Sequence, residues 1–186
     1  MFEEILARIG GTLNKHNLPY MIIGGQAVLL YGEPRLTRDI DVTLGFDTDR
    51  LNQLLAILQE IPLKPIPEDI ESFVKQTMVL PALDETTGIR VDFIFSFTPY
   101  ETGAIKRAKD INILKQKVYF ASVEDVVIHK IFAGRPRDLE DVRTILLKNP
   151  DIDIKYVRDW LKEFDASIGN KDFLKTFEDI LKTIED

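Results

Sequence analysis

The chain has 186 residues, of which 45% are apolar and 30% charged, and its formal net charge is −7; this composition is typical of one globular domain with a modest extension and excludes a disordered chain. Cysteine is absent and histidine occurs only at His16 and His129, which excludes disulfide scaffolds, thiol nucleophiles and three-histidine metal sites. No apolar run approaches the roughly 18 residues of a membrane span, and the acidic start lacks the basic region of a signal peptide, so we expect a cytoplasmic protein with no membrane partner.

The first part of the chain mixes helical and strand patterns. Apolar residues at the spacing of one helix face, or helix-forming composition, predict helices over residues 2–16, 26–31 and 51–61. Short apolar or alternating runs predict strands over residues 20–23, 39–44, 76–83, 89–97 and 117–121. A proline-rich linker is expected over residues 62–67, and the turn of a hairpin over residues 84–88.

The second part is predicted to be helical. Ser122 is placed to cap a helix that runs to about residue 133, and helical spacing continues over residues 138–148, 154–164 and 173–184. We therefore expect an α/β (α+β) core over residues 1–121, with a helical part over residues 122–186 packed on it to form a single compact unit.

Three aspartates lie on predicted strands. The alternation of residues 39–44 places Asp39 and Asp41 on one strand face, and Asp92 likewise lies opposite the apolar face of its own strand. A carboxylate on a partly buried sheet is costly unless a cation neutralises it. Carboxylates placed in this way can bind two hard cations about 3.5–4 Å apart, an arrangement that serves in-line phosphoryl displacement. The alternative is that Asp39 and Asp41 are ordinary edge-strand or turn residues.

The dipeptide Gly24-Gly25 ends a predicted strand and begins a predicted helix. Free backbone N–H groups at a helix start, with no side chain in the way, suit a phosphate group. A Gly-Gly turn is also common without any ligand. The chain contains neither GxxxxGK[ST] nor GxGxxG, so the sequence supports neither a P-loop nor a dinucleotide-binding fold.

Together these segments resemble a known superfamily. Ile23-Gly24-Gly25, Asp39-Ile40-Asp41-Val42 and Val91-Asp92-Phe93 resemble the hydrophobic-Gly-Gly, Asp-x-Asp and third-Asp signature of the polymerase-β-like nucleotidyltransferases. The string over residues 31–41, with the later His129-Lys130 and Arg137-Asp138-x-x-Asp141, is similar to the AbiEii-type branch, whose members include bacterial toxins. The resemblance covers about residues 20–145. It implies the nucleotidyltransferase fold, a small mixed β-sheet flanked by helices and followed by a C-terminal helical part.

The resemblance implies roles for the matching residues. Gly24 and Gly25 would hold the phosphates of a nucleoside triphosphate. Lys130 would meet the triphosphate or its developing charge, or else be a solvated helix lysine. Two Mg²⁺ ions, with Mn²⁺ as the alternative, would be bound by Asp39, Asp41 and Asp92. Of these carboxylates, Asp92 is the first choice for a general base that takes the proton of the acceptor hydroxyl.

Five further residues each have two interpretations. Arg35 and Arg137 are either phosphate ligands or ordinary exposed arginines. Asp138 either belongs to the nucleotide site or is the N-cap of its helix. Asp141, one turn further on, either reaches back toward the lysine or the nucleotide, or lies on the surface. His129 is expected to pack or to face solvent.

Residues 102–137 hold 8 basic and 3 acidic groups in a chain that is otherwise acidic. Such a segment attracts polyanions through its local potential, although a solvated face of lysines has the same composition. An RNA acceptor, such as a tRNA 3′ end, would follow a phosphate track formed by Lys106, Arg107, Lys109, Lys115 and Lys117.

The main functional hypothesis is a metal-dependent nucleotidyltransferase. It would transfer a nucleoside monophosphate from a nucleoside triphosphate to an acceptor hydroxyl of RNA, protein or a small molecule such as an aminoglycoside, and release pyrophosphate. The first alternative is a non-catalytic module of the same fold that binds a nucleotide, RNA or a partner protein. The others are a toxin–antitoxin component with an antitoxin partner, and a glycosyltransferase, which leaves Gly24-Gly25 and Asp92 without a role.

Overall fold

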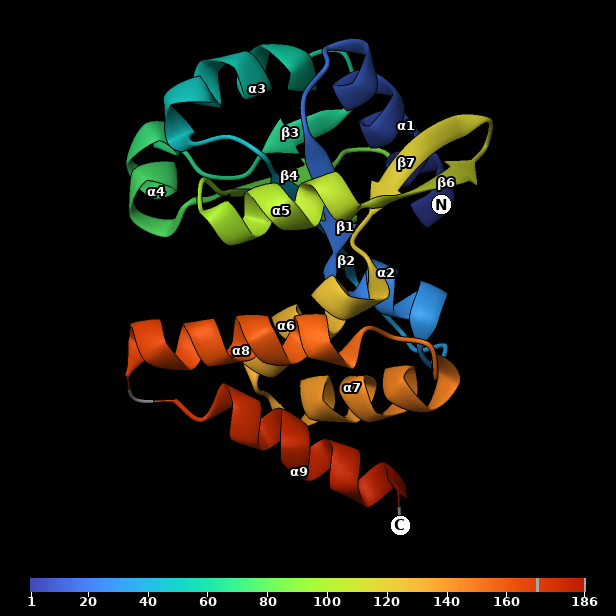
Figure 1. Cartoon of the computed structure of the whole chain (residues 1–186). Coiled ribbons are helices and arrows are strands. Elements are labelled where there is room, and N and C mark those ends of the chain that lie inside the picture. The colour runs from blue at the N-terminus through green and yellow to red at the C-terminus, as the bar shows by residue number, and fades with distance from the viewer. Residues whose placement is uncertain (170, 186) are drawn as a thin grey trace. The chain divides into compact units, whose positions relative to one another are not determined.

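Within residues 1–169 and 171–185, which the computed structural model describes, seven strands form one mixed sheet (Figure 1). The order of the strands across the sheet is β3-β4-β5-β2-β1-β7-β6. The pairs β2–β5 and β1–β7 are parallel and the other neighbours are antiparallel. The strands are β1 (Tyr20–Ile23), β2 (Asp39–Leu44), β3 (Leu63–Pro65), β4 (Val79–Asp84), β5 (Arg90–Phe95), β6 (Lys109–Ile113) and β7 (Gln116–Phe120).

The chain divides into two compact units. Unit 1 consists of Met1–Gln26 and Leu36–Ala121 and contains the whole sheet. Unit 2 consists of Ala27–Arg35 and Ser122–Asp186. The division that the sequence suggested, at residues 121 and 122, made no provision for the segment 27–35, which belongs to the second unit.

The central strands follow the alternation read from the sequence. In β2, Ile40, Val42 and Leu44 are fully buried, whereas Asp39 and Asp41 on the opposite face are partly exposed. Strand β5 repeats the pattern, with three buried apolar residues on one face and a partly exposed aspartate on the other. Because side chains alternate across a strand, the apolar sets build the core and the aspartates share the other face.

The helices of unit 1 pack on the sheet through apolar faces. Helix α1 buries Ile5, Leu6, Ile9 and Leu13 at helical spacing and contacts β7. Helix α4 begins at the N-cap Asp69, whose carboxylate accepts from a backbone N–H, and contacts β4. The helices of this unit are α1 (Phe2–Lys15), α3 (Leu51–Leu58), α4 (Ile70–Thr77), α5 (Pro99–Arg107) and the short 3-10 helix η1 (Thr48–Arg50). Helix α2 (Gly24–Tyr31) begins in unit 1 and continues in unit 2.

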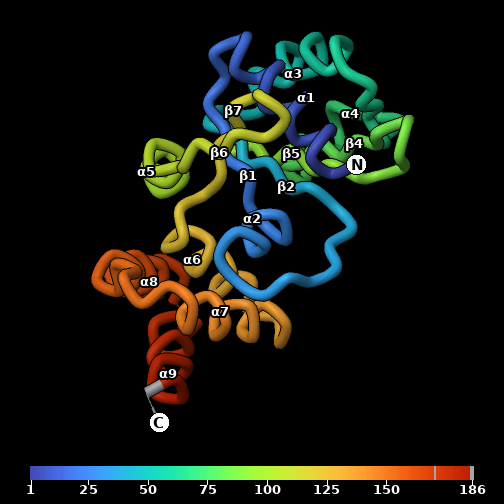
Figure 2. Tube along the Cα trace, turned by 90° about the vertical axis from the view of Figure 1, so that its right-hand side faces the viewer, coloured from blue at the N-terminus to red at the C-terminus, as the bar shows by residue number. Residues whose placement is uncertain are grey.

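Unit 2 is helical, and its helices contact one another in the pairs α6–α7, α6–α8, α8–α9, α7–α9 and α6–α9 (Figure 2). They are α6 (Val123–Ala133), α7 (Pro136–Lys148), α8 (Ile154–Ile168) and α9 (Phe173–Glu185). Ser122 caps α6 as predicted, since its hydroxyl accepts a hydrogen bond from the N–H of Asp125 at 3.2 Å. Gly134 ends the same helix with a left-handed conformation, φ +65°.

Segment 27–35 is fastened to the end of α7. Asn149 Nδ2 donates to the carbonyl of Tyr31 at 2.8 Å, and Lys148 Nζ donates to the carbonyl of Gly32 at 3.1 Å. The same ammonium group pairs with Glu33 at 2.8 Å. These contacts fix the backbone of the segment just before it returns to unit 1.

Several elements differ from the prediction. The proline-rich linker contains an edge strand, β3, and residues 76 and 77 end helix α4 rather than begin a strand. Helices α4 and α5 and strand β6 were not predicted. Strand β6 is an edge strand with little burial, so it lacks the apolar alternation that marks the central strands.

None of the helices, within the part of the chain that the structure describes, is both long and apolar enough to cross a membrane.

Candidate functional site

The junction of β1 and α2 brings Gly24 against Asp41. Helix α2 begins at Gly24, directly after the last residue of β1, and Ile23 pairs with Asp41 across the antiparallel β1–β2 ladder. Gly24 has φ +64°, and a β-carbon at this position would lie 1.9 Å from Asp41 Oδ2. Only glycine therefore fits here, because a side chain would meet both a backbone penalty and the carboxylate.

The parallel register of β2 and β5 brings the predicted carboxylates together. Asp41 lies opposite Asp92, and Asp39 lies opposite Arg90. Residues opposite one another in neighbouring strands project to the same face. The β1–α2 junction at Gly24, Asp41 on β2 and Asp92 on β5 thus lie side by side across three adjacent strands. Asp39 lies on the same face of β2, two residues before Asp41. We call Asp39, Asp41 and Asp92 the carboxylate row.

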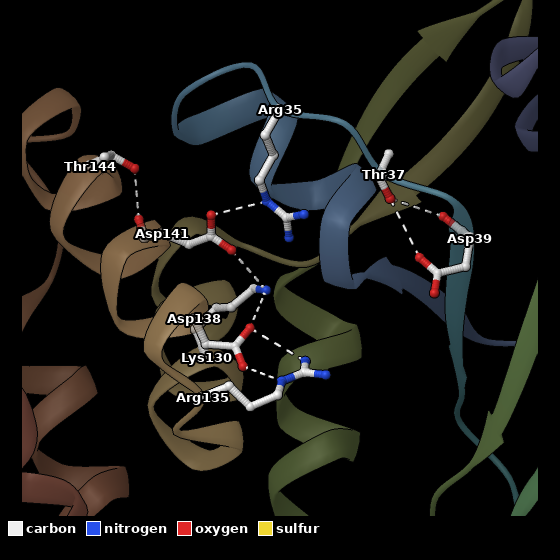
Figure 3. Close-up of polar contacts among 8 residues, drawn as sticks. All are labelled: Arg35, Thr37, Asp39, Lys130, Arg135, Asp138, Asp141 and Thr144. Carbon is white, nitrogen blue, oxygen red and sulfur yellow. Dashed lines mark hydrogen bonds and ion pairs between the residues drawn. The ribbon is translucent and has the colours of Figure 1, made fainter.

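Arg90 partly neutralises the carboxylate row. Its Nε donates to Asp92 Oδ1 at 2.7 Å. The hydrogen bond to Asp92 raises the pKa of Arg90, and the charges of Asp92, Asp39 and Asp41 add to the shift while burial opposes it. The guanidinium is therefore in the field of all three carboxylates. Thr37 is the neighbour of Asp39, with its hydroxyl 3.4 Å from Asp39 Oδ1 (Figure 3).

The donor chemistry of the carboxylate row fits a hard divalent cation, which prefers carboxylate oxygens. At Gly24 the place that a β-carbon would take is filled by the carboxylate of Asp41, which therefore lies directly against the start of α2. No group of three or more Asp, Glu, His or Cys side chains among residues 1–169 and 171–185 is arranged to hold a metal ion in the present rotamers. The register of β2 and β5 brings the backbones of Asp41 and Asp92 together, but the carboxylate of Asp92 is paired with Arg90.

Gln26, in the first turn of α2, was missed by the sequence reasoning. Its side chain is buried, and within the described residues its Nε2 has no hydrogen-bond partner. A buried amide N–H without a partner is costly unless another group accepts from it. Its position directly after Gly24-Gly25 was the signal that could have found it, since the start of a helix is where N–H donors face a phosphate.

Unit 2 contains a second charged cluster, centred on Lys130 (Figure 3). Lys130 Nζ lies 2.7 Å from Asp138 Oδ1 and 3.0 Å from Asp141 Oδ2, and all three side chains are less than a tenth exposed. Two arginines complete the cluster from outside: Arg35 Nε lies 3.0 Å from Asp141 Oδ1, and Arg135 Nε lies 2.6 Å from Asp138 Oδ2. We call these five residues the Lys130 cluster.

The cluster bears on the interpretations of Asp138 and Asp141. Asp138 is not an N-cap, because α7 begins at Pro136 and its N-cap is Arg135. Proline suits the first helical position, which moves the start of the helix ahead of Asp138. Burial raises the pKa of Asp138, but hydrogen bonds from Arg135 and Lys130 outweigh it and hold that pKa below its usual value. Asp141 reaches back to Lys130, one of the two possibilities that the sequence left open.

A pocket of about 530 Å³ lies beside this cluster in unit 2. It is lined by Glu33, Arg35, Pro136, Arg137, Glu140, Asp141 and Thr144. The predicted phosphate ligands Arg35 and Arg137 thus share one pocket, together with acidic side chains.

Other predicted residues lie apart from these groups. His129 is partly exposed, with its Nε2 buried, and burial followed by the charge of Lys130 lowers its pKa to about 4. In unit 1, the basic residues of the expected phosphate track lie on α5, β6, β7 and the turn between these strands. Of these, Lys117 pairs with Asp110 at 3.1 Å on the exposed β6–β7 hairpin.

A family model described as "Nucleotidyltransferase of unknown function (DUF6036)" matches residues 1–184. No sequence among curated proteins matches the chain significantly.

Solved structures share the fold at low sequence identity. The solution structure of the antibiotic-resistance factor ANT(2'')-Ia has a TM-score of 0.60 and 17% identity, covering 90% of this chain and 94% of that chain. ANT(2'')-Ia in complex with adenylyl-2''-tobramycin has a TM-score of 0.57 and 18% identity, covering 87% and 97%. An antigenic nucleotidyltransferase-like protein from Paracoccidioides brasiliensis has a TM-score of 0.56 and 17% identity, covering 94% and 92%. These similarities confirm the predicted fold class.

Proposed function

Because the chain belongs to the family of nucleotidyltransferases of unknown function, we propose that it is a metal-dependent nucleotidyltransferase that uses the carboxylate row. The single observation that carries the proposal is the alignment of the Gly24 junction, Asp41 and Asp92 across β1, β2 and β5. In this alignment the start of a helix, whose first N–H groups have no partner within the helix, lies next to carboxylates on one sheet face. Those are the two features that a triphosphate and its metal ions need.

The proposed reaction forms one bond and breaks one. The oxygen of an acceptor hydroxyl attacks the α-phosphorus of a nucleoside triphosphate, and the bond from that phosphorus to the β-phosphate oxygen breaks. The products are the acceptor nucleoside monophosphate ester and pyrophosphate. The hydroxyl proton passes to a carboxylate, for which Asp92 is the candidate because it lies at the far end of the row from the Gly24 junction.

Each of the candidate site residues of unit 1 has a distinct part in this proposal. The N–H groups at Gly24 and Gly25, with the buried amide of Gln26, donate to the phosphates. Asp39, Asp41 and Asp92 would hold Mg²⁺, or Mn²⁺ in its place. Such ions, when bound, neutralise the phosphates and stabilise the attacking and leaving oxygens. The protein otherwise positions the two substrates, which is where most of the catalysis in phosphoryl transfer arises.

For unit 2 we propose that Arg35 and Arg137, which line the same pocket of this unit, bind phosphate groups of the nucleotide. We propose that Lys130 mainly holds Asp138 and Asp141 in place, since its ammonium group is buried between them. A direct contact of Lys130 with the triphosphate stays a prediction from the resemblance. The AbiEii-type branch and an antitoxin partner likewise stay predictions.

The acceptor class is proposed on two grounds. ANT(2'')-Ia was solved in complex with adenylyl-2''-tobramycin, which supports a small-molecule acceptor in a protein of this fold. The basic residues on α5, β6 and β7 support an RNA acceptor instead. The two acceptors differ in their salt dependence, because RNA binding through phosphate contacts weakens steeply as salt rises.

The test is a transfer assay with each α-labelled nucleoside triphosphate and Mg²⁺. Cellular RNA, cellular protein and a panel of small hydroxyl compounds are offered separately as acceptors. Wild type should transfer label, whereas Asp39→Asn and Asp41→Asn should lose transfer while keeping their fold. Asp159→Asn is the control, since Asp159 is an exposed aspartate of α8 whose partner is Lys155.

A second function, a binding module without catalysis, is favoured by the ion pair of Asp92 with Arg90. It predicts that a nucleotide raises the melting temperature without any transfer of label. Transfer that depends on Asp39 and Asp41 excludes the module. Full activity of both Asn variants would exclude the proposed site.

A further inference from the structure

Arg90 lies within the carboxylate row itself. It is in register with Asp39 on the neighbouring parallel strand and precedes Asp92 by two residues on its own strand. Its side chain therefore projects to the same face as all three carboxylates. Its Nε donates to Asp92 Oδ1 at 2.7 Å, with the arginine side chain 53% exposed and the aspartate 17% exposed. The arginine head is thus held at the row, while about half of its side chain is exposed to solvent.

The row needs positive charge. Asp41 and Asp92 lie directly opposite each other, and like charges in opposite positions of neighbouring strands destabilise a sheet. The guanidinium of Arg90 offsets this repulsion with one charge against three. Its pKa is raised chiefly by the hydrogen bond to Asp92, with further contributions from the charges of Asp92, Asp39 and Asp41, so the offset extends along the row.

We propose that Arg90 is an internal counter-ion of the carboxylate row, which pairs with Asp92 in the metal-free protein and is displaced when a divalent cation binds there. The inference rests on the metal site of the proposed function. It adds a residue that raises the metal concentration at which this site is half-saturated. An arginine and a divalent cation carry charge of the same sign and compete for the same carboxylate oxygens. Binding of one therefore weakens binding of the other.

Two opposite effects follow from removing Arg90. Without metal, the variant loses the cation that offsets the row, so its melting temperature falls. With metal, binding to the variant does not have to break the Arg90–Asp92 ion pair. A lower metal concentration is therefore enough to half-saturate the site. We expect the half-saturating metal concentration to fall about two- to fivefold, the factor that an exposed ion pair of this kind represents.

The experiment compares wild type with Arg90→Gln, Arg90→Met and Arg90→Lys. Bound Mn²⁺ is measured directly from the loss of the electron paramagnetic resonance signal of free Mn²⁺ during titration. Melting temperatures are recorded in chelator and in saturating Mn²⁺. Arg50→Gln is the control, because Arg50 is another arginine of unit 1, bonded to Gln53 rather than to an acid. Asp41→Asn identifies binding at the row.

The neutral variants should bind Mn²⁺ at a lower concentration than wild type, and should melt below it in chelator by a margin that shrinks in Mn²⁺. Arg90→Lys, which keeps the charge, should stay close to wild type. An unchanged or higher half-saturating concentration in both neutral variants, with binding that still depends on Asp41, overturns the role of Arg90 and leaves the proposed metal site intact. Absence of saturable binding in wild type and in all Arg90 variants overturns the metal site and this inference with it.

Discussion

The carboxylate of Asp41 fills the space that a side chain at Gly24 would need: a β-carbon on residue 24 would lie 1.9 Å from Asp41 Oδ2. The contact joins the start of α2 to the middle of β2. It means that the shape of the backbone at the helix start and the position of one carboxylate are fixed together.

Gly24→Ala should destabilise the protein by about 2–4 kcal/mol, from the left-handed backbone conformation together with displacement of Asp41. Gly88→Ala is the matched control, because Gly88 also has positive φ, +72°, and a β-carbon added there would meet nothing within 4 Å. The control should lose only about 1–2 kcal/mol. Urea unfolding of both variants measures the difference, and equal losses would show that Asp41 is not in the way.

Gln26→Met should weaken nucleotide binding without lowering the stability of the ligand-free protein. The buried Nε2 has no partner within the described residues, so an apolar side chain of similar length removes an unsatisfied donor. Thr43→Val is the control, since its Oγ1 is also buried and without a hydrogen-bond partner in the described chain. Thermal melts with and without nucleotide separate the two effects. A variant that melts several degrees lower without ligand would show that the amide is satisfied in solution.

Lys130→Met should cost about 3–5 kcal/mol of stability, because it leaves the buried carboxylates of Asp138 and Asp141 without their central cation. Lys155→Met removes an equally close pair, with Asp159, from a helix surface where the lysine is 84% exposed. That control should leave stability almost unchanged, because an exposed ion pair contributes little. Denaturant titration at neutral pH gives both values. Similar small losses would contradict the importance of the buried cluster.

His129 should make the protein lose stability in mild acid. Burial, and then the charge of Lys130, lowers its pKa from 6.5 to about 4. Between these values the unfolded chain takes up a proton on this residue and the folded protein does not, so stability falls as the pH falls from 6.5 toward 4. The shift corresponds to at most about 3 kcal/mol.

The measurement is the free energy of unfolding against pH for wild type and His129→Gln. The wild-type curve should fall more steeply than that of the variant between pH 6.5 and 4, and the difference between the curves isolates this residue. His16→Gln, which removes the other histidine, is the control. Parallel curves for wild type and His129→Gln would show that the ring titrates normally.

The sequence predicted the centre of the sheet well because its strands are marked either by a continuous apolar run, as in β1, or by alternating polar and apolar residues, as in β2. Strands β1 and β2 begin and end where the pattern placed them, and Asp39 and Asp41 share a face. The expected neighbour of this pair, Asp92, is in register with Asp41. What the sequence could not supply was the order of the strands, which depends on contacts between segments far apart in the chain.

The errors lie where local patterns are weak. Strand β3 was taken for a linker because Pro65 and its neighbours look like a breaker, although an edge strand tolerates proline. The ion pairs of the Lys130 cluster were not predicted as a group, since no local pattern shows that Lys130, Asp138 and Asp141 are buried together while Arg35 and Arg135 pair with the two carboxylates. Arg90 was overlooked because an arginine two residues before an aspartate is ordinary until the register places both beside a second strand.

The division of the chain into units also bears on the order in which the protein folds during synthesis. Residues 27–35 belong with Ser122–Asp186, although the ribosome produces them long before the rest of that unit. The sheet can be completed once β7 has emerged, because all of its strands precede residue 121. Segment 27–35 has to wait for Lys148 and Asn149, which hold its backbone. A nascent chain stalled after β7 would therefore expose this segment, including Ala27 and Val28, which are buried in the complete protein, to chaperones or proteases.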